Sequence, residues 1–244
     1  MRRKTVRAMV LCLAAVAILA MAVAPAEAKK RNVNPRVIPP QAVPYGHTYG
    51  EWCAKWWQWL ATTPVPYSEG TGTNTGEGQS GPVWFLANNM TVTWNPDFDG
   101  YDGVGWADWS VTMPAGKALF FPVFRDTPMY GTDEAELRAA WDWWLSHVTE
   151  LSATVDGRPL GDLFAYRAPS PLFPLGWVEG NIWQFDAAPP ETAMEDGYWV
   201  LLAPLPPGQH VIHTYSKIVL TEDEAGENFR FVQDFTYHIT VVPG

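Results

Sequence analysis

The clearest hydrophobic pattern lies near the end of the chain, in residues 229–241. Apolar and polar side chains alternate there with a period of two, which is typical of a β-strand that buries one face. Gln233 is the one polar residue that interrupts the apolar face. The apolar members of this face are Phe229, Phe231, Phe235, Tyr237, Ile239 and Val241.

Shorter apolar runs separated by turn residues predict further strands. Asp156-Gly157 is a strong hairpin dipeptide, and we expect 111–113 and 118–124 to form another hairpin around 114–116. Residues 95–108 are predicted to be a loop. These features together indicate a mainly β fold, an antiparallel β-sandwich of the immunoglobulin-like or jelly-roll-like kind with two accessory α-helices. The remaining predicted strands are 83–87, 90–94, 152–155, 197–202 and 209–220.

The first helix is predicted near 49–62, where Thr48 and Glu51 have the spacing of a capping box. It should end before Pro64. Its apolar residues cover two adjacent stripes and leave little polar surface, so we expect the helix to be enclosed rather than to offer a platform to a ligand. The tryptophans in those stripes are Trp52, Trp56, Trp57 and Trp59.

A second helix is predicted near 133–148, with Thr132 as its N-cap. Acidic residues in its first turn complement the positive end of the helix dipole. Its apolar stripe is formed by Leu137, Trp141, Trp144, Leu145 and Val148.

Residues 1–28 have the features of a signal peptide: a basic start, an apolar run and an Ala-x-Ala site that ends at Ala28. An uncleaved N-terminal anchor is the alternative. A Pro-rich arm, 29–46, should follow, and 47–244 should form one β-sandwich domain. Cys53 would be the only cysteine after cleavage near Ala28, which excludes an intramolecular disulfide.

The formal net charge of the chain is −10, and removal of 1–28 would make it more negative. An acidic chain without a basic stripe is a poor partner for nucleic acid. No later apolar run is long enough for a transmembrane segment. We therefore expect a protein that is secreted, or located in the periplasm or cell envelope, and that meets an extracellular ligand or an envelope component. The oligomeric state stays open.

Five segments together resemble an uncharacterised family of exported bacterial proteins. The resemblance implies export but transfers no catalytic or binding residue. Members of that family often carry cysteines near the second and third segments, and this chain has none there. The segments are Tyr49–Trp59, Gly78–Ala87, Pro114–Pro122, Val155–Leu160 and Pro204–His213.

The segment 94–103 places oxygen-bearing side chains at alternating positions before a glycine, as in a calcium-binding loop. The predicted metal ligands are Asn95, Asp97, Asp99 and Asp102. The twelfth position of such a loop would be Trp106, where a bidentate Glu is required, so the match is incomplete. The alternative is a polar turn in which Asn and Asp bond their own backbone. No other cofactor is expected.

The same region is rich in aromatic side chains, which in an exported β-sandwich suggest carbohydrate binding through ring stacking. The predicted ligand-binding residues are Trp94, Tyr101, Trp106 and Trp109. The alternative is that these rings fill the core of the sandwich.

Evidence for catalysis is weaker. Cys53 is expected to be a buried apolar residue, since its helix is surrounded by Trp. His213 and His238 could approach each other across a strand pair, which leaves a hydrolase of unfamiliar type as an alternative. The sequence contains no established catalytic motif, and no catalytic residue is assigned. Our leading hypothesis is a non-catalytic binding module for carbohydrate or a similar ligand, and a structural component of the envelope is the other alternative.

Overall fold

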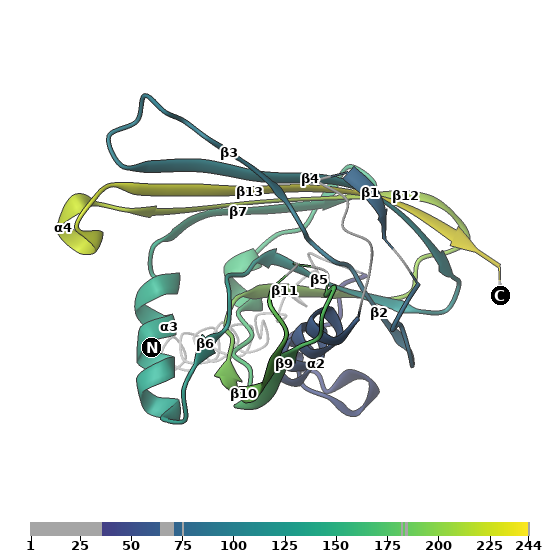
Figure 1. Cartoon of the computed structure of the whole chain (residues 1–244). Coiled ribbons are helices and arrows are strands. Elements are labelled where there is room, and N and C mark those ends of the chain that lie inside the picture. Colours follow the sequence, from purple (N-terminus) through teal and green to yellow (C-terminus); the bar gives the residue numbers. More distant parts are fainter. Residues whose placement is uncertain (1–35, 64–70, 75, 182, 184, 244) are drawn as a thin grey trace, which may run out of the picture. The chain divides into compact units, whose positions relative to one another are not determined.

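The structure is a computed structural model that describes residues 36–63, 71–74, 76–181, 183 and 185–243. The predicted signal peptide, 1–28, and the first part of the predicted arm, 29–35, lie outside the described residues. The described elements form a mainly β fold with a few helices, so the predicted fold class is confirmed (Figure 1).

A large sheet of seven strands dominates the fold. Its order is β1-β4-β13-β12-β7-β8, and β3 pairs with β4 on the same edge as β1. The central pair, β4 and β13, runs parallel over fourteen residues, and β12 and β7 are antiparallel neighbours. The strands are β1 (Thr71–Asn74), β3 (Thr91–Trp94), β4 (Tyr101–Pro114), β7 (Val148–Val155), β8 (Arg158–Pro159), β12 (Gly208–Leu220) and β13 (Phe229–Val242).

Two smaller sheets complete the β structure. One has the order β11-β5-β2 and the other the order β6-β10-β9. The first contains β2 (Val83–Phe85), β5 (Ala118–Phe124) and β11 (Tyr198–Leu202), and the second contains β6 (Met129–Tyr130), β9 (Phe173–Trp177) and β10 (Ala188–Met194).

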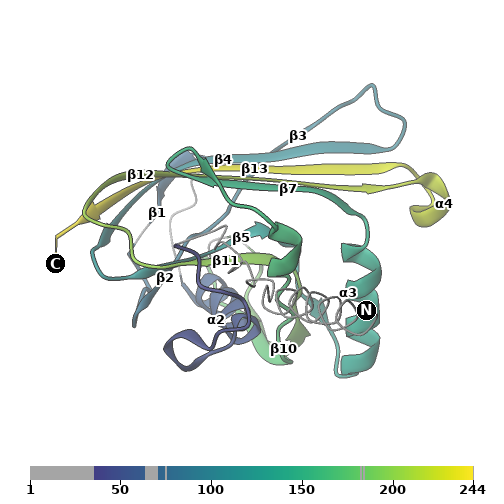
Figure 2. The same cartoon turned by 180° about the vertical axis from the view of Figure 1, so that it is seen from behind.

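The β11-β5-β2 sheet is the middle layer of the fold, with the large sheet on one face and helix α2 (Tyr49–Thr62) on the other (Figures 1 and 2). Its side chains alternate between two cores. Phe121 and Val200 pack with the large sheet, whereas Phe120 and Trp199 pack with α2. Because both faces are covered, every residue of β5 and β11 is buried, and the two strands are apolar at nearly every position.

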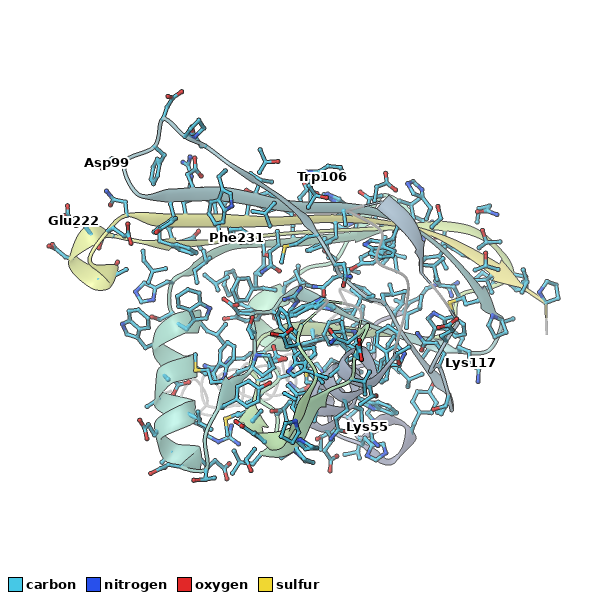
Figure 3. All side chains as sticks on the ribbon, viewed as in Figure 1. Lys55, Asp99, Trp106, Lys117, Glu222 and Phe231 are labelled. Carbon is cyan, nitrogen blue, oxygen red and sulfur yellow. The ribbon has the colours of Figure 1, made fainter. Side chains whose placement is uncertain are left out.

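The side chains of the long strand β13 alternate between a buried and an open face of the large sheet. The alternation expected for 229–241 is confirmed: Phe235, Tyr237 and Ile239 are almost inaccessible, whereas His238 is exposed. Trp106 of β4 lies on the open outer face and Phe231 of β13 on the inner face (Figure 3).

Helix α2 begins with the expected capping box between Thr48 and Glu51. Its enclosure is also confirmed, since all four tryptophans are at most 7 % exposed. Trp56 donates its indole N–H to the Leu86 oxygen at 2.9 Å and meets the ring of Trp199 edge-on. The tryptophan helix therefore belongs to the architecture rather than to a ligand surface.

The second predicted helix is present as α3 (Glu134–Leu145), with two corrections. Asp133 is the N-cap in place of Thr132, since its carboxylate accepts hydrogen bonds from the Ala135 and Glu136 amides. Val148 belongs to β7 rather than to the helix. Three short helical segments, η1 (Pro44–Gly46), η2 (Leu163–Tyr166) and α4 (Glu222–Ala225), lie in connections.

Two predictions, one of a loop and one of a hairpin, are wrong. The predicted loop 95–108 is strand β4 from Tyr101 onward, because β13 and β3 supply hydrogen-bonding partners that a local pattern does not show. The predicted hairpin around 114–116 is a crossover between layers, since β4 pairs in the large sheet and β5 in the middle sheet. The hairpin at Asp156-Gly157 is confirmed as β7–β8.

In the described part of the Pro-rich arm, 36–46, the first residues run beside β11. Val37 forms an isolated bridge with Leu202, and the Ile38 amide donates to the Leu201 oxygen at 2.9 Å. Among the helices that the structure describes, none combines the length and hydropathy required to span a membrane.

Candidate functional site

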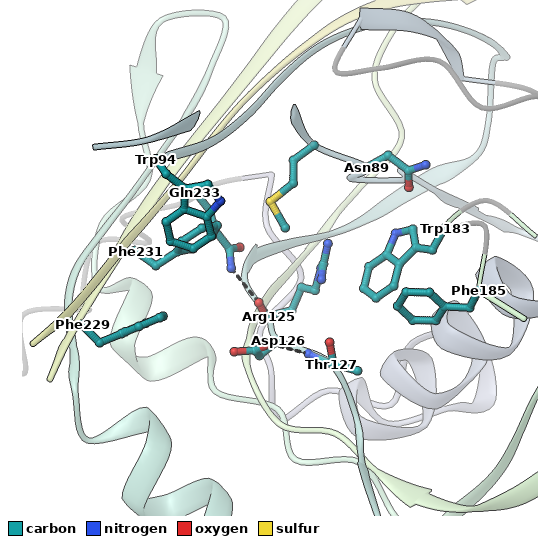
Figure 4. A pocket seen from close by; sticks show the side chains of 11 residues that line it. Asn89, Trp94, Arg125, Asp126, Thr127, Trp183, Phe185, Phe229, Phe231 and Gln233 are labelled. Atoms are coloured by element: carbon teal, nitrogen blue, oxygen red, sulfur yellow. Dashed lines mark hydrogen bonds between the residues drawn. The ribbon is translucent and has the colours of Figure 1, made fainter. Parts of the chain in front are cut away.

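A pocket of about 410 Å³ is lined by residues of the large sheet and of the connections after β5 and β9, and Figure 4 shows their side chains. Residues of β3 and β13 line one side, Trp183 and Phe185 line the other, and the residues that follow β5 lie between them. The pocket contains both aromatic rings and polar side chains, which is the usual composition of a small-molecule site.

Two glycines of β4 lie against side chains that line the pocket. Gly103 and Gly105 occupy inward positions opposite Phe231 and Gln233 in the register of the two strands. A Cβ atom at Gly103 would come within 2.7 Å of the Trp94 ring, and one at Gly105 within 2.2 Å of the Met90 sulfur. Farther along β4 the inward residues are larger and pack against the middle sheet. The glycines thus allow the Trp94 and Phe231 rings and the Met90 sulfur to approach the β4 backbone closely.

Aromatic rings form two opposite walls. Phe231 packs against Trp94 at 5.8 Å between centroids and stacks on Phe229 at 6.4 Å. On the other wall, Trp183 and Phe185 meet edge-on at 5.3 Å. Trp94 is 51 % exposed and Phe185 is 42 % exposed, so both rings are accessible at the rim.

The guanidinium of Arg125 lies between these walls (Figure 4). It is only 2 % exposed and sits 4.2 Å from the centroid of the Trp183 ring and 5.6 Å from that of Trp57. Nε donates to Asn88 Oδ1 at 3.0 Å and Nη2 to the Asn88 main-chain oxygen at 3.2 Å. Burial lowers the pKa of Arg125 to about 10, so the group remains charged at neutral pH.

Gln233 is the second buried polar residue of the pocket. Its Nε2 donates to the main-chain oxygen of Arg125 at 2.8 Å, and the side chain is 4 % exposed. Its Oε1 has no hydrogen-bond partner among the described residues. An unsatisfied buried acceptor costs about 1–3 kcal/mol, so a ligand that donates a hydrogen bond here would relieve that cost.

Two carboxyl groups lie near the guanidinium without forming an ion pair with it. Asp126 lines the pocket and accepts a hydrogen bond from the Thr127 amide at 2.7 Å, and burial raises its pKa. Glu195 is fully buried behind the pocket, where Trp57 Nε1 donates to its Oε2. Burial raises the pKa of Glu195 well above its usual value and so favours the neutral acid.

The structure separates the four aromatic residues that the sequence predicted as ligand-binding. Trp94 lines the pocket. Tyr101 is not among the lining residues, but the centroid of its ring lies 6.0 Å from that of Trp94. Trp106 lies on the opposite face of the sheet (Figure 3). Trp109 is 3 % exposed and donates its indole N–H to the Asn89 oxygen at 3.2 Å. Trp109 is therefore a core residue, because its position in β4 points inward where the middle layer covers the sheet.

The four predicted metal ligands lie in and beside the β3–β4 turn. Asp102 accepts hydrogen bonds from Nε and Nη2 of Arg230 and from Asn95 Nδ2. The Asn95 Oδ1 accepts from the Asp97 amide at 3.1 Å, as in an Asx-turn. No group of three or more His, Cys, Asp or Glu side chains that could hold a metal ion occurs among the described residues. Calcium binding through Asn95, Asp97, Asp99 and Asp102 stays a prediction.

The residues considered for catalysis do not line the pocket. His213 pairs with Asp234 at 2.7 Å and His238 with Asp108 at 3.0 Å on the outer face of the large sheet. Cys53 is inaccessible in α2, and burial raises the pKa of its thiol, as expected for a buried apolar residue.

Comparison of the chain with protein-family models, with curated proteins and with solved structures found no match.

The sequence pattern missed most of the pocket, although it contained one signal. Gln233 is the single polar interruption of the inward face of β13, and that interruption marks the pocket. Arg125 directly follows the fully buried run of β5, where a charge is unexpected. Trp183 and Phe185 have no local signal, because only the tertiary structure brings their segment opposite β13.

Proposed function

We propose that this protein is an exported, non-catalytic binding protein whose pocket holds a carbohydrate or a similarly polar ring-shaped ligand. The observation that carries the proposal is the combination, in one 410 Å³ pocket, of accessible aromatic rings with buried polar groups. The volume falls in the range of about 300–1,000 Å³ that is typical of small-molecule sites. Export is supported by the signal-peptide pattern of residues 1–28.

The two walls suit a sugar ring in particular. The apolar C–H faces of a pyranose pack against indole and phenyl rings, while its hydroxyl groups need hydrogen-bond partners. Trp94 and Phe185 supply rings at the rim, and Gln233 supplies a buried acceptor at the base. A purely apolar ligand would leave that acceptor unsatisfied, which favours a ligand with hydroxyl groups.

A binding role is favoured over hydrolysis because the histidines that a hydrolase would use lie on the outer face of the sheet. Asp126 is the only Asp or Glu among the described residues that line the pocket. A glycosidase of the usual kind needs two carboxyl groups that flank the scissile bond. No described contact favours the alternative role as a structural envelope component.

A glycan array, followed by calorimetric titration of each hit, tests the proposal. The mature chain should bind at least one saccharide, with Trp94→Ala weakening binding about tenfold, as expected for an aromatic contact worth more than about 1 kcal/mol. Trp106→Ala is the matched control, since this exposed ring lies outside the pocket, and it should bind as the wild type does. Parallel measurements with and without calcium test the predicted metal site. Absence of saccharide binding under both conditions would contradict the proposal.

A further inference from the structure

Arg125 is a buried cation that forms no ion pair with any Asp or Glu in the described part of the chain. Arg138, Arg167 and Arg230 each form an ion pair with an Asp or Glu, and each is more exposed than Arg125. No described Asp or Glu oxygen lies within 4.0 Å of the Arg125 side chain. Burying a charge is unfavourable unless it is paired, so this arrangement is unusual for a purely structural arginine.

The contacts that Arg125 does make leave part of its guanidinium available. The rings of Trp57 and Trp183 stabilise the charge through cation–π interactions, and Asn88 receives the hydrogen bonds of Nε and Nη2. Among the described residues Nη1 has no acceptor, while the residue lines the pocket. Guanidinium groups bind carboxylates with strong charge-assisted hydrogen bonds.

Gln233 provides an independent second observation at the same place. Its Oε1 has no partner among the described residues, and both Gln233 and Arg125 line the pocket, so the pocket offers a donor and an acceptor. A ligand that carries both a carboxylate and a hydroxyl group would satisfy both. The carboxylate would accept from Arg125, and the hydroxyl would donate to Gln233.

We propose that the pocket selects an acidic saccharide of the uronate class, with the carboxylate on Arg125, a hydroxyl on Gln233 Oε1 and the sugar ring between the aromatic walls. This inference rests on the proposed function, since it concerns the same pocket. Neither nearby acid forms an ion pair with the guanidinium at hydrogen-bond distance: Asp126 accepts from the Thr127 amide, and Glu195 accepts from Trp57 Nε1.

Calorimetric titration of the mature chain with glucuronate, galacturonate, glucose, galactose and glucose 6-sulfate tests this proposal. A uronate should bind at least tenfold more tightly than its neutral counterpart, and Arg125→Gln should abolish that preference. Arg158→Gln, which removes an exposed arginine outside the pocket, should retain it. If Arg125→Gln does not fold, the wild-type preference for a uronate decides the question, and Gln233→Met should weaken uronates and neutral sugars alike.

Each outcome has a distinct meaning. Equal binding of neutral and acidic sugars overturns the carboxylate assignment while the proposed function stands. Tighter binding of the sulfate ester than of either uronate overturns the choice of carboxylate. Failure of all five sugars to bind, together with a negative glycan array, removes the proposed function itself.

Discussion

The side chain of Gln233 donates a hydrogen bond from Nε2 to the main-chain oxygen of Arg125, 2.8 Å away. The contact joins the inner face of β13 in the large sheet to the residue that follows β5 in the middle sheet. It lies where the apolar packing between the two layers ends and the pocket begins. The same contact holds the Gln233 amide, whose Oε1 we propose as a ligand contact.

Truncation of the α2 core should be strongly destabilising. Trp56→Ala removes a fully buried indole and leaves the Leu86 oxygen without its donor, so we expect a loss of about 3–5 kcal/mol in the free energy of unfolding. Urea denaturation measures the change. Trp143→Ala, at a position 47 % exposed on α3, should stay within about 0.5 kcal/mol of the wild type. Similar losses for the two variants would argue against the assigned role of α2.

Gly103→Ala should disturb the pocket wall. The new methyl group would lie 2.7 Å from the Trp94 ring and 2.8 Å from the Phe231 ring, so both must move, at a cost of about 1–3 kcal/mol. Thermal denaturation and tryptophan fluorescence should both report the change. At Gly131 the nearest atom to an added Cβ is 3.4 Å away on the Leu137 side chain, and Gly131→Ala should be far milder. A milder effect at Gly103 than at Gly131 is the contrary result.

The ion pair between Asp102 and Arg230 should give stability a specific acid dependence. Hydrogen bonds from Arg230 and Asn95 lower the pKa of Asp102 to about 2, below the value of about 3.9 in an unfolded chain. The pair therefore stabilises the fold fully above about pH 4, and this contribution is lost as the pH falls through about 2. Asp102→Asn should lower the melting temperature at pH 7, with the difference from wild type shrinking toward pH 2.

The matched control for that ion pair is a double-mutant cycle. Asp102→Asn and Arg230→Gln remove the same interaction, so their effects at pH 7 should be clearly less than additive. Additive effects, or a difference that stays constant between pH 6 and pH 2, would show that the carboxylate is not stabilised by Arg230.

The Cys53 thiol should be unreactive in the folded protein. It is inaccessible, its Sγ lies 3.4 Å from the Ala168 oxygen, and burial raises its pKa, so little thiolate forms at neutral pH. In a Cys12→Ser background, a disulfide reagent should modify Cys53 only after denaturant is added. Rapid modification of the native chain, at the rate of free cysteine, would contradict the enclosure of α2.

The sequence predicted an element well where its signals come only from residues close together in the chain. The capping residues Thr48 and Glu51 and the tryptophan stripes defined α2, since capping and amphipathic spacing depend only on near neighbours. The alternation in β13 likewise predicted which side chains are buried. The errors occurred where a strand pairs with a partner that is distant in the sequence. Strand β4 begins at Tyr101 because β13 lies beside it, and the glycine-rich stretch carries little local pattern that predicts this pairing.

The sequence by itself determined that this chain is a mainly β protein with an enclosed tryptophan helix, and it marked Gln233 as an exception within an apolar face. Only the tertiary structure decided that β5 lies between two layers, and that Trp94, Arg125 and Trp183 meet around one pocket. The physical reason is that periodicity reports which face of an element is buried. It does not report which distant element covers that face, or where the cover ends and leaves a cavity.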